Sequence, residues 1–266
     1  MTPGSAKARR WALAYAVVLV IAGLSAAVVE QRREVRQLMG DLFTLRMQVS
    51  TQALALESAS RCATSQEDGF ARDNRRLGPP KAGERRLVFL GDSITEIWKV
   101  ETSFAGLGLK PINRGIGGET SPLIAARVYP DVVQLRAKAM VLLAGTNDLG
   151  PKRHFRTEEN LRAAVQEAGR AGIPTLLGTI PPVGPRESDA VLKNADARRI
   201  NAWIKRWCAD RARCEVADYH AALSNEGGFF DQRNFREGLH PNERGFERMA
   251  AELKAALARM KRRGLI

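Results

Sequence analysis

The stretch Leu87-Val88-Phe89-Leu90-Gly91-Asp92-Ser93 decides the fold, because a short apolar run stops here at a polar turn. Four apolar residues in a row are typical of a strand buried on both faces, as in a parallel sheet. Further apolar runs lie at 111–113, 139–144, 174–180 and 214–219. Helical patterns between and after them lie at about 121–136, 157–171, 195–211 and 242–262. This alternation predicts an α/β fold of three layers, with helices on both faces of a five-stranded parallel sheet.

Polar residues follow four of the predicted strands at their carboxyl ends. The blocks are Gly91-Asp92-Ser93, the segment 113–120, Gly145-Thr146-Asn147-Asp148 and the loop 181–186. In open parallel sheets, ligands bind beyond the carboxyl ends of the strands. The sequence therefore predicts a site at this edge of the sheet, and we expect the loop 181–186 and Arg114 to border it. Trp98 either borders the site too or, as is more common for tryptophan, packs in the core.

Three of these blocks, together with Gly238-Leu239-His240-Pro241 before the last predicted helix, resemble the motifs of the SGNH (GDSL-type) hydrolases. Each block alone is short enough to recur by chance. Four blocks in the family's order and spacing, over residues 85–260, form a specific signal. The resemblance implies a flavodoxin-like α/β/α sandwich over residues 85–263 and a serine hydrolase that acts on ester bonds.

The residue types in these blocks suit acyl transfer. A serine hydroxyl is a poor nucleophile until a base takes its proton, and the oxyanion that then forms needs preorganised N–H donors. The resemblance implies that Ser93 is the nucleophile and His240 its base. It also implies an oxyanion hole made by Ser93, Gly118 and Asn147. Gly118 has no side chain to keep substrate from its amide, and Asn147 carries a side-chain NH2 donor.

Glu237 departs from the family pattern, which has an aspartate three residues before the histidine. Glutamate keeps the charge but is one methylene longer, so its carboxylate must fold back to reach His240. An orienting carboxylate fixes the tautomer of the histidine and stabilises the imidazolium. Three interpretations stay open: Glu237 orients His240, Asp231 takes its place, or Ser93 and His240 work as a dyad.

Asp92 and Asp148 are expected to support the site structurally, by accepting backbone N–H bonds in the turns that carry Ser93 and Asn147. No group of His, Cys, Asp and Glu residues has the spacing of a metal site, so we expect no metal and no other cofactor. His154 is expected at the surface, and His220 is expected to make a structural hydrogen bond.

The amino terminus predicts a membrane anchor. Residues 11–29 form a run of 19 positions without a charge, which the basic segment 1–10 precedes. At about 1.5 Å rise per residue, this helix spans roughly 28 Å, close to the thickness of the hydrocarbon core. A cleavable signal peptide is the alternative. In both cases we expect export, and the anchor predicts a single-pass inner-membrane protein with a periplasmic catalytic domain.

Residues 30–61 predict a helical stalk. Apolar residues recur every seven positions, at Val28, Val35, Leu42, Val49 and Leu56. Leu38 and Leu45 follow two of them by three positions, which is the a/d spacing of a coiled coil. The pattern predicts a parallel homodimer through residues 28–56, and a single amphipathic helix that lies on the catalytic domain is the alternative. Residues 62–84 are polar and predict a linker, with the folded domain beginning near Arg85.

Charge and cysteine content narrow the class of protein. Lys and Arg number 42 against 29 Asp and Glu, a net charge of +13. The excess is spread along the chain without a basic helix, so we do not expect a nucleic-acid partner. Three cysteines exclude a disulfide scaffold. Cys208 and Cys214 could form a disulfide in an exported protein, and Cys62 could bridge two stalks.

Together these observations predict a membrane-anchored serine esterase. The blocks leave no room for a large lid domain, which favours an open groove and a small acyl group such as acetyl. A membrane tether favours a substrate on envelope carbohydrate or lipid. Two alternatives remain: a hydrolase-like domain that has lost catalysis and acts through its coiled coil, and an acyltransferase that uses the same residues.

Overall fold

The computed structural model describes residues 30–31, 34–35, 37–38, 70–151 and 155–266. The predicted membrane span 11–29, most of the predicted stalk, Cys62 and His154 lie outside these residues. None of the helices in the described residues has the length and apolar character to cross a membrane. The chain divides into two units, Met1–Ser58 and Ala59–Ile266, and the folded domain belongs to the second.

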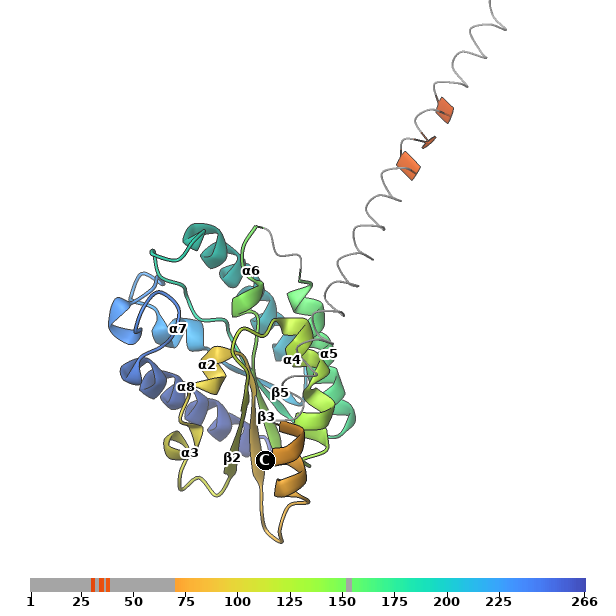
Figure 1. Ribbon diagram of the computed structural model, residues 1–266, viewed down its shortest axis with the longest axis vertical. Coiled ribbons are helices and arrows are strands. Elements are labelled where there is room, and N and C mark those ends of the chain that lie inside the picture. Colours follow the sequence, from red (N-terminus) through yellow and green to blue (C-terminus); the bar gives the residue numbers. More distant parts are fainter. Residues whose placement is uncertain (1–29, 32–33, 36, 39–69, 152–154) are drawn as a thin grey trace, which may run out of the picture. The chain divides into compact units, whose positions relative to one another are not determined.

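A five-stranded sheet forms the centre of this domain, in the order β2-β1-β3-β4-β5, and every neighbouring pair is parallel (Figure 1). The strands are β1 (Arg86–Gly91), β2 (Lys110–Gly115), β3 (Ala139–Leu143), β4 (Thr175–Gly178) and β5 (Cys214–Ala217). The prediction of a five-stranded parallel sheet is therefore confirmed. Because all five strands run the same way, their carboxyl ends meet at one edge.

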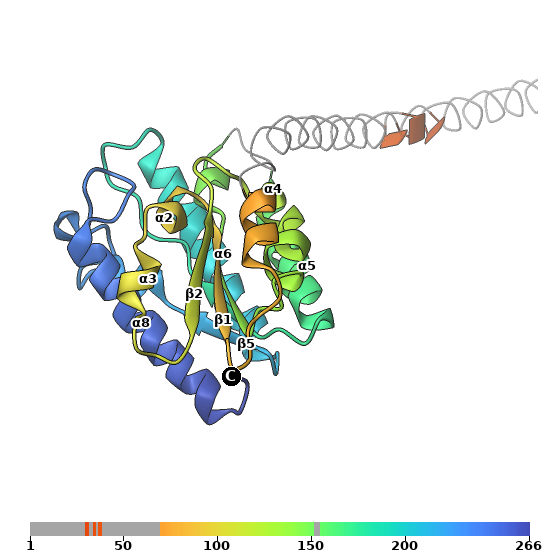
Figure 2. The same cartoon turned by 60° about the horizontal axis from the view of Figure 1, so that its bottom comes forward.

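Helices cover both faces of the sheet, which gives the three predicted layers (Figure 2). Alternate residues of β1 point to opposite faces: Val88 and Leu90 enter one core, and Leu87 and Phe89 enter the other. The first core packs against α4 (Ser121–Ala126), α5 (Thr157–Arg170) and α6 (Ala190–Ala209). The second packs against α2 (Ser93–Glu96), α3 (Val100–Ser103), α7 (Tyr219–Leu223) and α8 (Glu243–Arg262).

Two helices differ from their predicted bounds. The helix expected at 121–136 ends at Ala126, and a π-helical turn, Tyr129–Val133, follows it. Pro130 lies in that turn and has no N–H to continue an α-helical ladder. The helix expected at 195–211 begins earlier, because the Asn194 side chain bonds both the N–H and the C=O of Val183 and so fixes the first turn of α6.

The predicted linker contains a helix, residues 70–77, that packs against the domain. Its Asn74 accepts a hydrogen bond from Arg114 Nη2 at 2.7 Å and donates one to Asp131 Oδ1 at 2.8 Å. Asp73 pairs with Arg114 at 2.7 Å, and the Phe70 ring lies 4.8 Å from the same guanidinium. The folded domain therefore begins before Arg85. The polar composition suggested a linker because this helix is held mainly by polar contacts.

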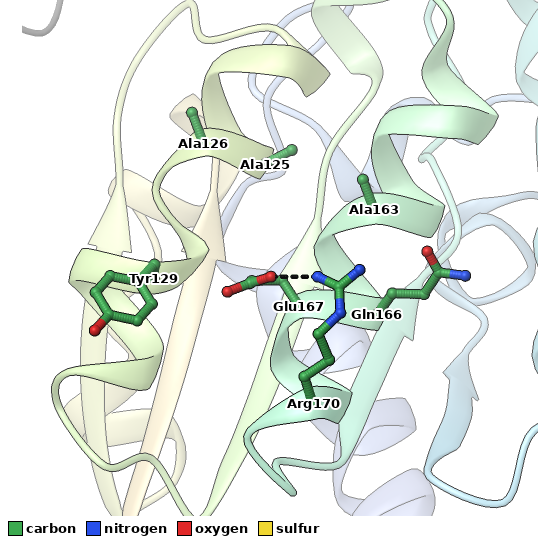
Figure 3. A pocket seen from close by; sticks show the side chains of 7 residues that line it. All are labelled: Ala125, Ala126, Tyr129, Ala163, Gln166, Glu167 and Arg170. Carbon is green, nitrogen blue, oxygen red and sulfur yellow. Dashed lines mark hydrogen bonds and ion pairs between the residues drawn. The ribbon is translucent and has the colours of Figure 1, made fainter.

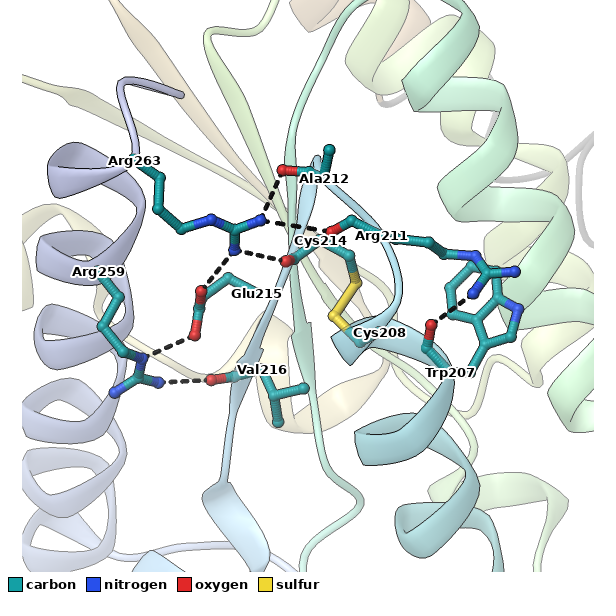
Figure 4. Close-up of a disulfide and its surroundings, with 9 residues drawn as sticks. All are labelled: Trp207, Cys208, Arg211, Ala212, Cys214, Glu215, Val216, Arg259 and Arg263. Atoms are coloured by element: carbon teal, nitrogen blue, oxygen red, sulfur yellow. Dashed lines mark hydrogen bonds and ion pairs between the residues drawn. A yellow bond between two sulfur atoms is a disulfide. The ribbon is translucent and has the colours of Figure 1, made fainter.

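A disulfide joins Cys208, near the end of α6, to Cys214, the first residue of β5 (Figure 4). This is the pairing that the sequence allows. On the other side of β5, Arg259 of α8 and Arg263, which directly follows α8, both pair with Glu215, at 2.7 and 2.9 Å. The edge strand β5 is thus linked to α6 on one face of the sheet and to α8 on the other.

Candidate active site

Ser93 stands at the turn from β1 into α2, at the carboxyl edge of the sheet. The turn is tight: a Cβ at Gly91 would lie 2.2 Å from Thr95 Oγ1 and 2.6 Å from Leu143 O. Ser93 is therefore placed by contacts that only glycine at position 91 permits, and its side chain is partly exposed.

Asp92 caps α2 from a fully buried position, where its Oδ1 accepts the Ile94 N–H at 3.0 Å. Burial raises the pKa of Asp92 to about 7. The Ile94 amide and the Thr146 hydroxyl oppose this rise, whereas the nearby carboxylates of Asp148 and Glu119 add to it. The Asp92 carboxyl thus accepts a backbone N–H bond in the turn that carries Ser93, which is the structural role expected from the sequence.

His240 bridges Ser93 and Glu237. Its Nε2 lies 2.9 Å from Ser93 Oγ, and its Nδ1 makes a short contact with Glu237 Oε1. The same oxygen accepts the backbone N–H of His240 at 2.9 Å. The Glu237 side chain has therefore folded back onto the histidine three residues later. When Nδ1 carries the proton and donates it to Glu237, Nε2 is left to accept the Ser93 proton.

Asp231, the other carboxylate considered for this place, is used elsewhere. It caps a 3₁₀ turn by accepting the Arg233 N–H at 3.1 Å, and it pairs with the Arg233 guanidinium at 2.8 Å. The structure thus brings Glu237, and not Asp231, to His240. Asn242, two residues after His240, caps the start of α8 by accepting the Gly245 N–H. Its side-chain NH2 donates to Phe235 O at 3.2 Å, which holds the end of the loop that carries Glu237 and His240.

The loop after β2 runs beside Ser93. A Cβ at Gly117 would lie 3.9 Å from Ser93 Cβ. Gly118 is exposed, adopts a φ of +78°, and has open space where a side chain would stand. This left-handed conformation favours glycine, and the free space leaves the loop backbone accessible to a ligand.

Asn147 and Asp148 follow β3 in a short 3₁₀ turn and hold the neighbouring segments. Asn147 Nδ2 donates to Glu119 O at 2.9 Å, which ties its amide to the Gly118 loop. Asp148 accepts the Ser121 N–H at 2.9 Å and the Thr157 hydroxyl at 2.8 Å. Asp148 therefore joins the amino ends of α4 and α5 beneath the site, in the supporting role that the sequence analysis expects.

Arg127 lies at the centre of a buried network behind the same loop. It pairs with Glu119 and Asp131, both at 2.6 Å, and donates to Arg114 O at 3.0 Å. A longer bond of 3.4 Å reaches Gly91 O, two residues before the serine. Burial raises the pKa of Glu119, and the Arg127 charge opposes that rise. Arg127 was not predicted as part of the site, because a lone arginine in a helical pattern carries no signal of burial.

The loop that follows β4 supports the histidine loop. Gly184 N donates to Gly238 O at 2.6 Å, in the segment between Glu237 and His240. Asn201 of α6 bonds the N–H and C=O of Ile180 at 2.7 and 2.9 Å, which fixes the start of that loop. The expectation that residues 181–186 border the site agrees with this contact.

Trp98 takes the core alternative, and Arg114, which was expected at the border, is placed elsewhere. Trp98 is 3% exposed and packs edge-on against Phe89 and Tyr219 in the core. Arg114 is 3% exposed and turns toward the helix 70–77. His220 makes the expected structural bond, from Nδ1 to Ile180 O at 3.0 Å, and burial lowers its pKa.

A groove of about 300 Å³ lies between α4 and α5, away from these residues (Figure 3). It is lined by Ala125, Ala126, Tyr129, Ala163, Gln166, Glu167 and Arg170. None of the residues predicted to be catalytic lines it. In the part of the chain that the structure describes, no group of three or more His, Cys, Asp or Glu residues is arranged to hold a metal ion.

Comparison with known families agrees with this geometry. The model of the GDSL-like lipase/acylhydrolase family matches residues 89–248, which span the Ser93 turn, the Gly118 loop, the Asn147 turn and His240. None of the curated protein sequences compared with the chain matches it.

Solved structures share the fold. A protein from Bacteroides fragilis assigned as an acylhydrolase is 27% identical, with 73% of this chain and 96% of that chain covered and a TM-score of 0.64. A GDSL-like lipase from Bacteroides thetaiotaomicron is 26% identical, with 71% and 96% covered and a TM-score of 0.63. An acetylxylan esterase from Geobacillus stearothermophilus is 19% identical, with 66% and 95% covered and a TM-score of 0.55, which shows likeness of fold alone.

Proposed function

The chain belongs to the GDSL-like lipase/acylhydrolase family and is an ester-hydrolysing serine hydrolase; we propose that it removes small acyl groups, of acetyl size, through Ser93, His240 and Glu237. The observation that carries this proposal is the contact chain from Ser93 Oγ through His240 to Glu237, with 2.9 Å between Ser93 Oγ and His240 Nε2. Nucleophile, base and orienting carboxylate are then in hydrogen-bond contact.

The mechanism has two displacements. Ser93 Oγ attacks the ester carbonyl carbon while His240 Nε2 takes the hydroxyl proton, and Glu237 stabilises the imidazolium. The tetrahedral intermediate collapses, the bond to the alcohol oxygen breaks, and His240 returns the proton to that oxygen. An acyl group remains on Ser93. Water then attacks it with His240 again as base, which releases the acid and restores the serine.

Three donors stabilise the negative oxygen in this proposal: the backbone amides of Ser93 and Gly118 and the side-chain amide of Asn147. The open space at Gly118 supports its part, because substrate can approach the backbone there. The Asn147 amide is oriented by its bond to Glu119 O, so it need not reorganise during the reaction. Preorganised donors of this kind each contribute about 10² to 10³ in rate.

The substrate in this proposal is an acyl ester on an envelope glycan or lipid. The segments between the strand-end blocks are short and leave no room for a large lid domain, which supports an acyl group of acetyl size. The run 11–29 supports a single-pass anchor in the inner membrane, with the catalytic domain in the periplasm. The heptads support a parallel dimer through residues 28–56.

A hydrolase-like domain without catalysis was the main alternative, and its support was the change from aspartate to Glu237. The contact of Glu237 with His240 removes that support.

Turnover of p-nitrophenyl acetate by the full chain and by its Ser93→Ala variant tests the proposal. We expect kcat to fall by about 10³-fold or more in the variant, because the nucleophile is lost while the oxyanion donors remain. A fluorophosphonate probe should label the wild-type protein at Ser93 and fail to label the variant. Equal turnover by two proteins of equal thermal stability would overturn the proposal.

A further inference from the structure

Glu96 places a carboxylate beside Ser93 and next to Gly117 of the oxyanion loop. A Cβ built at Gly117 would lie 2.9 Å from Glu96 Oε2 and 3.9 Å from Ser93 Cβ. The carboxylate and the nucleophile therefore flank the same point, directly before Gly118. Glycine at 117 leaves room for the carboxylate in this position, and a larger residue there would displace it.

The backbone of Glu96 is fixed by the fold, which keeps the base of its side chain beside this segment. Its N–H donates to Asp92 O at 2.9 Å, and its C=O accepts from Asn113 Nδ2 at 3.3 Å. A Cβ at Gly115, where β2 ends, would lie 2.1 Å from Glu96 N. The last residue of α2 is thus pressed against the end of β2.

Glu96 has no ion-pair partner among the residues that the structure describes. Its side chain is exposed, and the mechanism above does not use it. A negative charge here acts on whatever part of the ester lies over Ser93 and Gly117. It repels an anionic group, and it accepts hydrogen bonds from hydroxyl groups.

We propose that Glu96 is a specificity-determining residue, which accepts hydrogen bonds from hydroxyl groups on the alcohol part of the ester and disfavours an anionic group there. The inference rests on the proposed function and narrows its substrate to acyl esters of neutral polyols, such as sugars. Glycerophospholipids, whose phosphate would meet this carboxylate, are then poor substrates.

Kinetics with a matched pair of acetate esters tests the repulsion. The probes are 4-acetoxybenzoate, which is anionic, and methyl 4-acetoxybenzoate, which is neutral. We expect the ratio of kcat/KM for the anionic over the neutral ester to rise about threefold to tenfold in Glu96→Gln. The rise should shrink at high salt, since salt screens an exposed charge.

A monoacetylated methyl glucoside tests the attraction. Glu96→Met removes the acceptor, and we expect kcat/KM for the glucoside to fall about threefold to tenfold relative to methyl 4-acetoxybenzoate. Glu101→Gln changes an exposed residue of α3 and alters the net charge as Glu96→Gln does. It should leave unchanged both the anionic-to-neutral ratio and the glucoside ratio of kcat/KM.

The outcomes separate the two proposals. If the wild-type protein hydrolyses the esters and Glu96→Gln leaves the anionic-to-neutral ratio unchanged, or Glu101→Gln shifts it equally, the role of Glu96 is overturned and the esterase stands. An unchanged glucoside ratio in Glu96→Met overturns the polyol preference. If the wild-type protein hydrolyses none of the three esters, the proposed function and this inference fall together.

Discussion

The base side of the site, Glu237 and His240, is partly exposed to solvent, whereas the ion pairs of Arg127 that support the oxyanion side lie mostly in the interior. The side chains of His240 and Glu237 are 30% and 48% exposed and lie three residues apart. On the oxyanion side, Arg127 is 16% exposed and its partners Glu119 and Asp131 are 6% and 4% exposed.

This difference separates catalysis from stability. An exposed charged pair contributes about 0–1 kcal/mol to the free energy of unfolding, so the base side can change with little effect on folding. Removal of one partner of a buried ion pair leaves an uncompensated charge and costs several kcal/mol. Damage to the base side should therefore lower kcat alone, and damage to the oxyanion side should lower stability and kcat together.

The largest effect is expected for Arg127→Met, which leaves Glu119 and Asp131 buried without their cation. We expect the free energy of unfolding in urea to fall by about 3–5 kcal/mol, and kcat to fall in the protein that remains folded. Arg170→Met is the control, because it breaks an exposed pair with Glu167 and should cost at most about 1 kcal/mol. Equal losses in the two variants would contradict the contrast between the two sides.

On the base side, Glu237→Gln should lower kcat for p-nitrophenyl acetate by about 10- to 100-fold, because the amide cannot stabilise the imidazolium. Urea unfolding should change by no more than about 0.5 kcal/mol, since the residue is half exposed. Glu243→Gln, another exposed glutamate, is the control. An undiminished kcat in Glu237→Gln would mean that Ser93 and His240 act as a dyad.

The two sides also differ in how much of them the sequence predicts. For the base side, contact between Glu237 and His240 was one of three alternatives, and it could be foreseen because the two residues are three positions apart and the motif fixes their spacing. The strands were predicted within a few residues, since runs such as 87–90 and 139–144 are apolar throughout.

The support of the oxyanion side was not predicted. Asp131 lies four residues after Arg127, but the bonds from Arg127 to the backbone of Gly91 and Arg114 form only when the sheet assembles. A mostly buried arginine also has no distinct local pattern. For the same reason, Asn74 and its helix were assigned to a linker, and Arg114 was expected beside substrate. Polar contacts between distant segments leave no periodicity in the sequence.

Asp92 belongs with the buried side and predicts a pH dependence. Its pKa is raised by burial to about 7 in the folded protein, above its ordinary value of 3.8. The folded state then holds the proton more tightly than the unfolded state, so this group lowers stability as pH rises from about 4 through 7. Asp92→Asn keeps an acceptor for the Ile94 N–H and carries no charge.

We therefore expect Asp92→Asn to be more stable than the wild-type protein at pH 8, by up to about 4 kcal/mol, with the difference vanishing near pH 4. Urea unfolding at a series of pH values measures it. Asp210→Asn changes an exposed aspartate and should show no such trend. A difference that is constant with pH would mean that Asp92 is ionised in the folded protein throughout this range.

The smallest effect is expected far from both sides, at the disulfide between Cys208 and Cys214. The bond closes a loop of few residues, so the double variant Cys208→Ala/Cys214→Ala should lose about 1–2 kcal/mol of stability. Reductant should produce the same loss in the wild-type protein and none in the variant. Because β5 lies at the sheet edge opposite β2, kcat should not change. A lower kcat in a variant that remains folded would show that the site also depends on β5. The base side and the oxyanion side would then not be the only two parts of the molecule that hold the site.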